Sequence, residues 1–164
     1  MAEVSNIWPL FLIAAAIGGF IYPITMGWQW GGGWLATLGF YDFAGSTLVH
    51  AVGGSAALAG VLLLGPRLGR FSNKGEIQSM EPFAASSIPL VTLGTFILWM
   101  GWYGFNGGSQ LALWSFEDAN AMSSIFMNTH LSGCGGCVMG PLITRVMCGS
   151  TDFIMLLYGV LEGL

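Results

Sequence analysis

Long apolar stretches, separated by short polar or glycine-rich segments, dominate the pattern of hydrophobic and polar positions along this chain. Four of them have the length of a membrane-crossing helix: residues 8–27, 43–64, 88–108 and 121–144. A helix needs about 20 apolar residues to cross the hydrocarbon core of a bilayer. A fifth apolar run, residues 153–164, is too short to cross. The pattern therefore predicts an all-α membrane protein with four crossings and a truncated fifth segment.

Composition supports a membrane protein and argues against several other classes. The chain is 54% hydrophobic and 7% charged, whereas soluble domains carry about 25% charged residues. Its net charge is −4 and its four basic residues form no extended patch, which argues against binding to nucleic acid. Three cysteines do not make a disulfide framework. No pattern of nucleophile and base, phosphate loop or acidic metal cluster is visible, so we expect neither an enzyme nor a bound metal or cofactor.

The connections between the apolar stretches carry signals for turns and helix ends. Glycines at 31–33 lie between tryptophans, which predicts a turn at a membrane interface. Asp42 precedes the second stretch, where its carboxylate can act as the N-cap of a helix by accepting hydrogen bonds from backbone N–H groups. The acidic pair Glu117 and Asp118 is expected in a short loop before the fourth stretch.

Two of the predicted helices carry small residues at a spacing of four, which places them on one helical face. They are Ala51, Ser55 and Ala59 in the second span, and Ser132, Gly136 and Gly140 in the fourth. Such faces let a neighbouring helix approach closely inside a membrane. Cys134 and Cys137 form a C-x-x-C in the same fourth span. Because that span is apolar and glycine-rich, we interpret them as packing residues rather than as a redox pair.

The basic residues predict how the chain is oriented in the membrane. Arg67, Arg70 and Lys74 follow the second span, and Arg145 follows the fourth. Because successive crossings alternate in direction, both places lie on one side, and the excess of positive charge makes that side cytoplasmic. We therefore expect a multi-pass protein of the cell membrane with a cytoplasmic N-terminus and an exterior turn at residues 31–33.

His50 is a candidate functional residue because of its depth. It lies within residues 43–64, an uncharged run of about 22 residues. An ionisable group at such a depth is costly unless it faces a cavity or a partner. A packing histidine, bonded to a carbonyl or a hydroxyl, is the alternative interpretation. His130 lies at a similar depth in the fourth span, so a haem held by two histidines, as in an electron carrier, is a further alternative.

Four motifs together resemble the ammonium transporter family (Amt/Mep/Rhesus) in their order and spacing. They are WGGGW at 30–34, DFAGSTLVH at 42–50, GPRLGR at 65–70 and GWYGFNGGS at 101–109. The resemblance covers nearly all of residues 1–164, as one partial transporter domain. It extends to somewhat under half of the family fold, which has about eleven spans in two inverted repeats. The matched part resembles the last two helices of the first repeat and the first two of the second.

The resemblance implies an ammonium site built from aromatic rings and a hydroxyl. Trp30 resembles the tryptophan that holds ammonium in the outer vestibule by cation–π attraction. Ser109 resembles the hydroxyl that accepts a hydrogen bond from that ion. Phe105 resembles one of two stacked rings that gate the pore, and Trp102 matches an aromatic position that lines it.

The resemblance also implies a pore below that site. His50 resembles the first of two paired pore histidines, which can hydrogen-bond ammonia or pass a proton because the pKa of histidine lies near physiological pH. Asp42 matches an acidic position that shapes the recruitment site. The implied function is passage of ammonium or ammonia across the lipid bilayer, by a homotrimer or by association with a full-length homologue.

The chain also departs from the family pattern. The second pore histidine and the first gating phenylalanine belong to family helices outside the matched part. His130 stands where family members usually have a small or amide residue. Glu162 lies in a segment where family members usually have small residues. A non-conducting interaction or regulatory subunit of a full-length transporter is therefore the alternative function.

Overall fold

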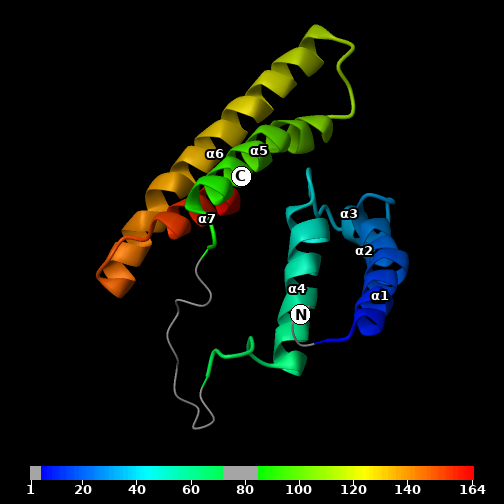
Figure 1. The fold of residues 1–164 in the computed structure, drawn as a ribbon. Coiled ribbons are helices and arrows are strands. Elements are labelled where there is room, and N and C mark those ends of the chain that lie inside the picture. Colours follow the sequence, from blue (N-terminus) through cyan, green and yellow to red (C-terminus); the bar gives the residue numbers. More distant parts are fainter. Residues whose placement is uncertain (1–4, 72–84) are drawn as a thin grey trace. The chain divides into compact units, whose positions relative to one another are not determined.

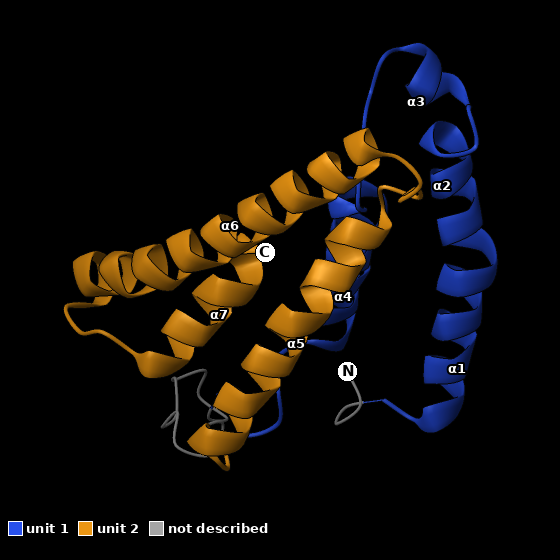
Figure 2. Ribbon diagram, turned by 90° about the horizontal axis from the view of Figure 1, so that it is seen from above, with its two compact units in different colours: residues 1–84 blue, residues 85–164 orange. Residues whose placement is uncertain are grey.

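The computed structural model describes residues 5–71 and 85–164, and the chain divides into two compact units, residues 1–84 and 85–164 (Figure 2). The regular elements of the described residues are helices, and they confirm the all-α class that the hydropathy pattern predicts (Figure 1). Lys74, one of the basic residues used to orient the chain, lies outside the described residues.

The described residues of the first unit form two apolar helical segments, and the glycine turn lies between them. A π-helical turn interrupts the first segment, and another begins the second. The elements are α1 (Ile7–Ala16), η1 (Ile17–Ile21), α2 (Tyr22–Gln29), α3 (Trp34–Thr37), η2 (Ser46–Ala51) and α4 (Val52–Leu64). Pro23 is the second residue of α2, close to the end of η1. Its missing N–H therefore falls where the hydrogen-bond pattern of the helix already changes.

The turn predicted at residues 31–33 is present, and it requires glycine because space is short. The N–H of Gly33 donates to the carbonyl oxygen of Gly27 at 3.1 Å. A Cβ atom on Gly33 would lie 2.6 Å from that same oxygen, so a larger residue would push the turn open. Gly32 has a φ of +73°, a backbone conformation that glycine adopts without steric cost. Trp30 therefore lies at the end of α2, next to a tightly closed turn.

The second unit contains three helices, and α6 contacts both of the others. They are α5 (Ile88–Gly108), α6 (Phe116–Cys148) and α7 (Phe153–Gly163). Each begins with a side chain that accepts a hydrogen bond from a backbone N–H of its own first turn. These capping residues are Ser87, Ser115 and Asp152. The short run at residues 153–164 is thus a helix, and it packs along α6 (Figure 1).

The prediction of a short acidic loop at Glu117 and Asp118 is wrong, because both residues lie in the first turn of α6. The physical reason is a capping box. The hydroxyl oxygen of Ser115 accepts from the N–H of Asp118 at 3.1 Å, and the carboxylate of Asp118 accepts from the N–H of Ser115 at 3.1 Å. Negative charge at a helix N-terminus is also favourable. The helix therefore begins at Phe116, before the expected start near residue 121.

A face of small residues joins α6 to α7 so closely that their backbones touch. Its members are Ser132, Gly136 and Gly140 of α6, and Gly159 and Gly163 of α7. A Cβ atom on Gly136 would collide with the carbonyl oxygen of Gly159, and one on Gly163 would collide with the carbonyl oxygen of Ser132. We call this contact the glycine seam. The small residues expected to attract a neighbour in the fourth span therefore have one in α7.

Four helices in the described ranges are long and apolar enough to cross a membrane. They are Ile7–Thr37, Ser46–Leu64, Ile88–Gly108 and Phe116–Cys148. The buried large apolar side chains of the described residues are few, namely Leu48, Leu157 and Val160. Most other large apolar side chains point outward, as Leu63 does at 87% exposure. An apolar exterior of this kind suits a lipid environment rather than water.

Candidate functional site

Asp42 organises the start of the second apolar segment. One oxygen of its carboxylate accepts from the N–H of Gly45 at 2.7 Å. The other oxygen accepts from the N–H groups of Thr47 at 2.9 Å and Leu48 at 2.8 Å. Asp42 therefore satisfies several backbone donors that a helix start leaves open, as its position in the sequence predicts. The prediction that it is the N-cap residue itself is wrong, because that place belongs to Gly45.

The reason for this difference is the backbone conformation of Gly45. Its φ of +112° turns the chain sharply at the start of η2, so a carboxylate three residues earlier reaches the amides of the first turn. Burial raises the pKa of Asp42, but hydrogen bonds from the N–H groups of Leu48, Gly45 and Thr47 together outweigh it. The pKa of Asp42 therefore lies below its ordinary value of 3.8, and the carboxylate is ionised at neutral pH.

Trp30 lies beside this carboxylate-capped turn. Its indole Nε1–H donates to the backbone carbonyl of Asp42 at 2.8 Å. A Cβ atom on Gly45 would lie 2.7 Å from the Val49 side chain, whereas it would only touch the Trp30 ring, at 3.4 Å. The hydrogen bond fixes one edge of the indole while the side chain remains 43% exposed. A ring held in this way can offer its face to a cation without losing the hydrogen bond of its polar edge.

His50 lies in the π-helical turn η2 and its side chain is exposed within this chain. The carbonyl oxygen of Gly45 accepts from the N–H of Val49 and from the N–H of His50, both at 2.9 Å. This shared bond combines an α-helical and a π-helical spacing, and such π turns occur frequently at functional sites. Hydrophobic periodicity could not reveal a π turn of six residues, because the turn changes the hydrogen-bond spacing of the helix and needs no change in the type of residue. Its signal in the sequence is limited to Gly45.

In the second unit, the structure brings together three residues that the motif GWYGFNGGS contains. The rings of Trp102 and Phe105 lie 5.3 Å apart between centroids, at an angle of 34°. The hydroxyl of Ser109 donates to the carbonyl oxygen of Phe105 at 3.0 Å. Because this bond uses the only hydroxyl proton, the oxygen of Ser109 faces any further partner as an acceptor. An acceptor beside aromatic rings is suited to a small cation that can donate hydrogen bonds.

His130 belongs to a second group of aromatic residues in that unit. Its Nδ1 lies 2.7 Å from the hydroxyl of Tyr103, and its ring lies 5.4 Å from the ring of Trp99. Sequence reasoning singled out His130 but neither of these neighbours. The spacing of Trp99 and Tyr103 could have placed them together, because residues 99 and 103 are about one helical turn apart and therefore lie on one face of α5.

The candidate residues thus form two sets. Trp30, Asp42 and His50 belong to the first unit, whereas Trp102, Phe105 and Ser109 belong to the second. Comparison with known proteins places the whole chain. The model of the Ammonium Transporter Family matches residues 1–164. The chain belongs to the ammonium transporter family. Membership confirms the partial transporter fold that the motifs imply, in a multi-pass membrane protein.

Several members of the family from distant organisms are similar to this chain. A Synechocystis sp. protein with a provisional ammonium-transporter name is 51% identical over 125 residues, which is 76% of this chain and 27% of that protein. An ammonium transporter of Archaeoglobus fulgidus is 40% identical over 161 residues, or 92% of this chain and 33% of that protein. One of Arabidopsis thaliana is 35% identical over 182 aligned positions, or 99% of this chain and 35% of that protein.

The chain therefore spans about a third of the length of these relatives. No solved structure matches it significantly.

Proposed function

We propose that this chain supplies part of a transmembrane pathway for ammonium or ammonia. The observation that carries the proposal is the match of the family model to residues 1–164. The relatives are named for ammonium transport, and a transporter of this kind needs no catalytic group of its own. The two sets of residues described above supply the chemistry that such a pathway requires.

Recruitment of the ion is assigned to Trp30 and Ser109. Ammonium loses strong hydration when it enters an apolar passage, so ring faces and an acceptor must replace the lost water. The fixed, part-exposed indole of Trp30 supports the first role. The hydroxyl of Ser109, whose proton is used by the carbonyl of Phe105, supports the second. In this proposal the carboxylate of Asp42 shapes the start of η2 and does not contact the ion.

Passage below the recruitment site is assigned to Phe105, Trp102 and His50. The contact between the rings of Trp102 and Phe105 supports an aromatic lining beside the gate, whose second stacked ring belongs to a family helix outside the matched part. His50 then accepts or donates a proton, or hydrogen-bonds neutral ammonia, in the apolar part of the pathway. A potassium ion can bind the ring faces but has no proton to give, so deprotonation would distinguish the two ions.

The setting of the pathway is the cell membrane, with the N-terminus in the cytoplasm. The basic residues Arg67, Arg70 and Arg145 support this orientation, since all three follow spans that would end on the same side. The turn at residues 31–33 then faces the exterior, where ammonium enters. The functional assembly is a homotrimer or a complex with a full-length homologue.

We also propose that residues 1–164 alone do not conduct. The chain spans about a third of its relatives, and in the family pattern the second pore histidine lies outside the matched part. The test uses a transporter-deficient cell grown on limiting ammonium, with the chain expressed alone and together with the missing family helices. We expect growth only in the second case, and we expect His50→Ala to abolish it.

Rescue by the chain alone would overturn the claim that it is incomplete. Absence of uptake in every combination, with the protein present in the membrane, would instead favour the non-conducting subunit. Co-purification of the tagged chain with a full-length transporter distinguishes that subunit from a protein without a partner.

A further inference from the structure

The peptide group that links Val49 to His50 is held at both of its polar ends. On one side, the N–H of His50 donates to the carbonyl oxygen of Gly45 at 2.9 Å. On the other side, the carbonyl oxygen of Val49 accepts from the hydroxyl of Tyr22 at 3.0 Å. Since a peptide group is planar, two hydrogen bonds at opposite ends fix its rotation. That rotation sets the direction in which the His50 side chain leaves the backbone.

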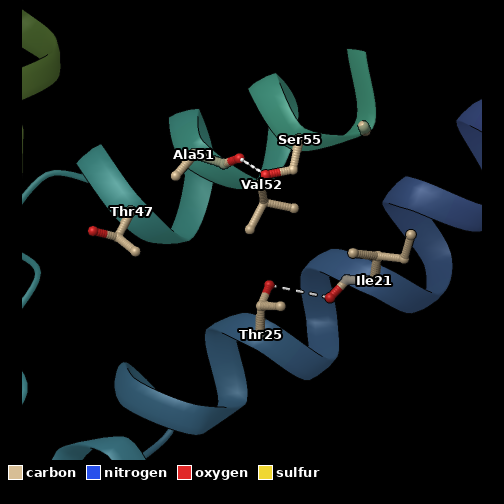
Figure 3. A pocket seen from close by; sticks show the side chains of 7 residues that line it. Ile21, Thr25, Thr47, Ala51, Val52 and Ser55 are labelled. Atoms are coloured by element: carbon tan, nitrogen blue, oxygen red, sulfur yellow. Dashed lines mark hydrogen bonds between the residues drawn. The ribbon is translucent and has the colours of Figure 1, made fainter. Parts of the chain in front are cut away.

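Tyr22 comes from the other helical segment of the same unit, 27 residues away in the chain. Two other hydroxyls that line the groove between these segments bond within their own helices (Figure 3). Thr25 donates to the carbonyl of Ile21 at 3.1 Å, and Ser55 donates to the carbonyl of Ala51 at 2.7 Å. They therefore do not tie the segments together, whereas the hydroxyl of Tyr22 does.

The approach of this hydroxyl depends on a glycine. A Cβ atom on Gly53 would lie 3.2 Å from the Tyr22 hydroxyl oxygen, closer than ordinary van der Waals contact. Gly53 follows His50 by about one helical turn and thus lies on the same side of the helix. The half-buried ring of Tyr22 thus brings its hydroxyl against the helix beside Gly53, where it bonds to the π turn through the carbonyl of Val49.

We infer that Tyr22 is a positioning residue for His50, acting through the Val49 carbonyl and the π turn η2. The inference rests on the proposed function, because it assigns His50 to the pathway. Without the hydroxyl, the carbonyl oxygen of Val49 loses its bond from the other helical segment and keeps the bond from the N–H of Val52 in its own helix. If the turn closed to α-helical spacing, residues on one side of it would rotate by about 100° about the helix axis. His50 would then point away from the direction that it has now.

Tyr22→Phe tests the inference, because it removes the hydroxyl and keeps the ring. The assay is ammonium uptake by the chain together with the missing family helices. We expect the maximal rate to fall about two- to tenfold, as for loss of one net hydrogen bond. The concentration for half-maximal uptake should stay unchanged, because Trp30 and Ser109 are intact. Tyr41→Phe is the matched control, since Tyr41 is an exposed tyrosine of the same unit and should transport normally.

Two further measurements separate positioning from a general loss of packing. The ¹³C signal of the Val49 carbonyl and the ¹⁵N signals of the His50 ring should shift in Tyr22→Phe and not in Tyr41→Phe. Gly53→Ala keeps the hydroxyl but crowds it, and should lower the maximal rate in the same way. Normal uptake and unshifted signals in Tyr22→Phe, while His50→Ala is inactive, would overturn the inference alone. Normal uptake in His50→Ala would instead overturn the pore role of His50.

Discussion

The glycine seam allows a sharp test, because neighbouring glycines of α6 differ only in what surrounds them. A Cβ atom on Gly136 would collide with the carbonyl oxygen of Gly159, whereas one on Gly135 would have nothing within 4 Å. Gly136→Ala and Gly135→Ala therefore make the same chemical change at two adjacent helical positions. Only the first forces the backbones of α6 and α7 apart.

The magnitude follows from two opposing contributions. Replacing glycine by alanine inside a helix favours folding by about 1 kcal/mol, and both variants share this gain. Overpacking a close contact costs about 1–3 kcal/mol, and only Gly136→Ala bears it. The difference in the free energy of unfolding between the two variants is thus about 1–3 kcal/mol, with Gly135→Ala the more stable. A chain of this size changes its melting temperature by about 2–4 °C per kcal/mol.

The assay is thermal unfolding of the whole chain in detergent micelles, followed by far-ultraviolet circular dichroism. We expect Gly135→Ala to melt at or above the temperature of the original chain. Gly136→Ala should melt clearly below Gly135→Ala, by several degrees. Gly159→Ala, which meets the carbonyl oxygen of Gly136 from the other helix, should behave as Gly136→Ala does. Equal melting temperatures for Gly135→Ala and Gly136→Ala would refute the backbone contact between α6 and α7.

Three further predictions concern the first unit and the orientation of the chain. The pKa of Asp42 is lowered by folding, so the stability that its carboxylate contributes is complete above about pH 4 and is lost as the pH falls further. Unfolding measured at a series of pH values should show this loss of stability. Asp42→Asn should be less stable than the original chain at pH 7 and should not show the loss at low pH. Trp30→Leu keeps bulk but removes the ring face, so uptake by the completed transporter should need a several-fold higher ammonium concentration, since cation–π contacts contribute about 0.5–2 kcal/mol. Reporter fusions should be cytoplasmic after Arg70 and exported before Glu117; a cytoplasmic fusion at Glu117 would contradict the proposed orientation.

Features that depend on the length of apolar runs could be predicted from the sequence. The helices Ile88–Gly108 and Ser46–Leu64 lie at the expected places because an apolar run of about 20 residues has few other stable forms in lipid. The role of Asp42 could also be predicted. A carboxylate just before an uncharged helix can accept from the unsatisfied backbone N–H groups of the first turn, whichever residue is the N-cap.

Features that depend on hydrogen bonds between distant residues could not be predicted. The bond from Tyr22 to Val49 joins two separate segments and leaves no pattern in the residue types, and the π turn η2 is signalled by Gly45 alone. The start of α6 is a different case. Ser115 and Asp118 spell a capping box in the sequence, but the charges of Glu117 and Asp118 suggested a loop. The capping signal was therefore present in the sequence, but the two charged residues led to the prediction of a loop.

The length of α6 can be compared with the thickness of a membrane. The helix has 33 residues, so it is about 50 Å long, while the hydrocarbon core of a bilayer measures about 30 Å. Asp118 and Arg145 carry opposite charges near its two ends, 27 positions apart, which corresponds to about 40 Å along the axis. That span matches the distance between the two headgroup layers. In a thinner bilayer the helix must tilt to keep both charges in contact with water, and α7 must tilt with it through the glycine seam.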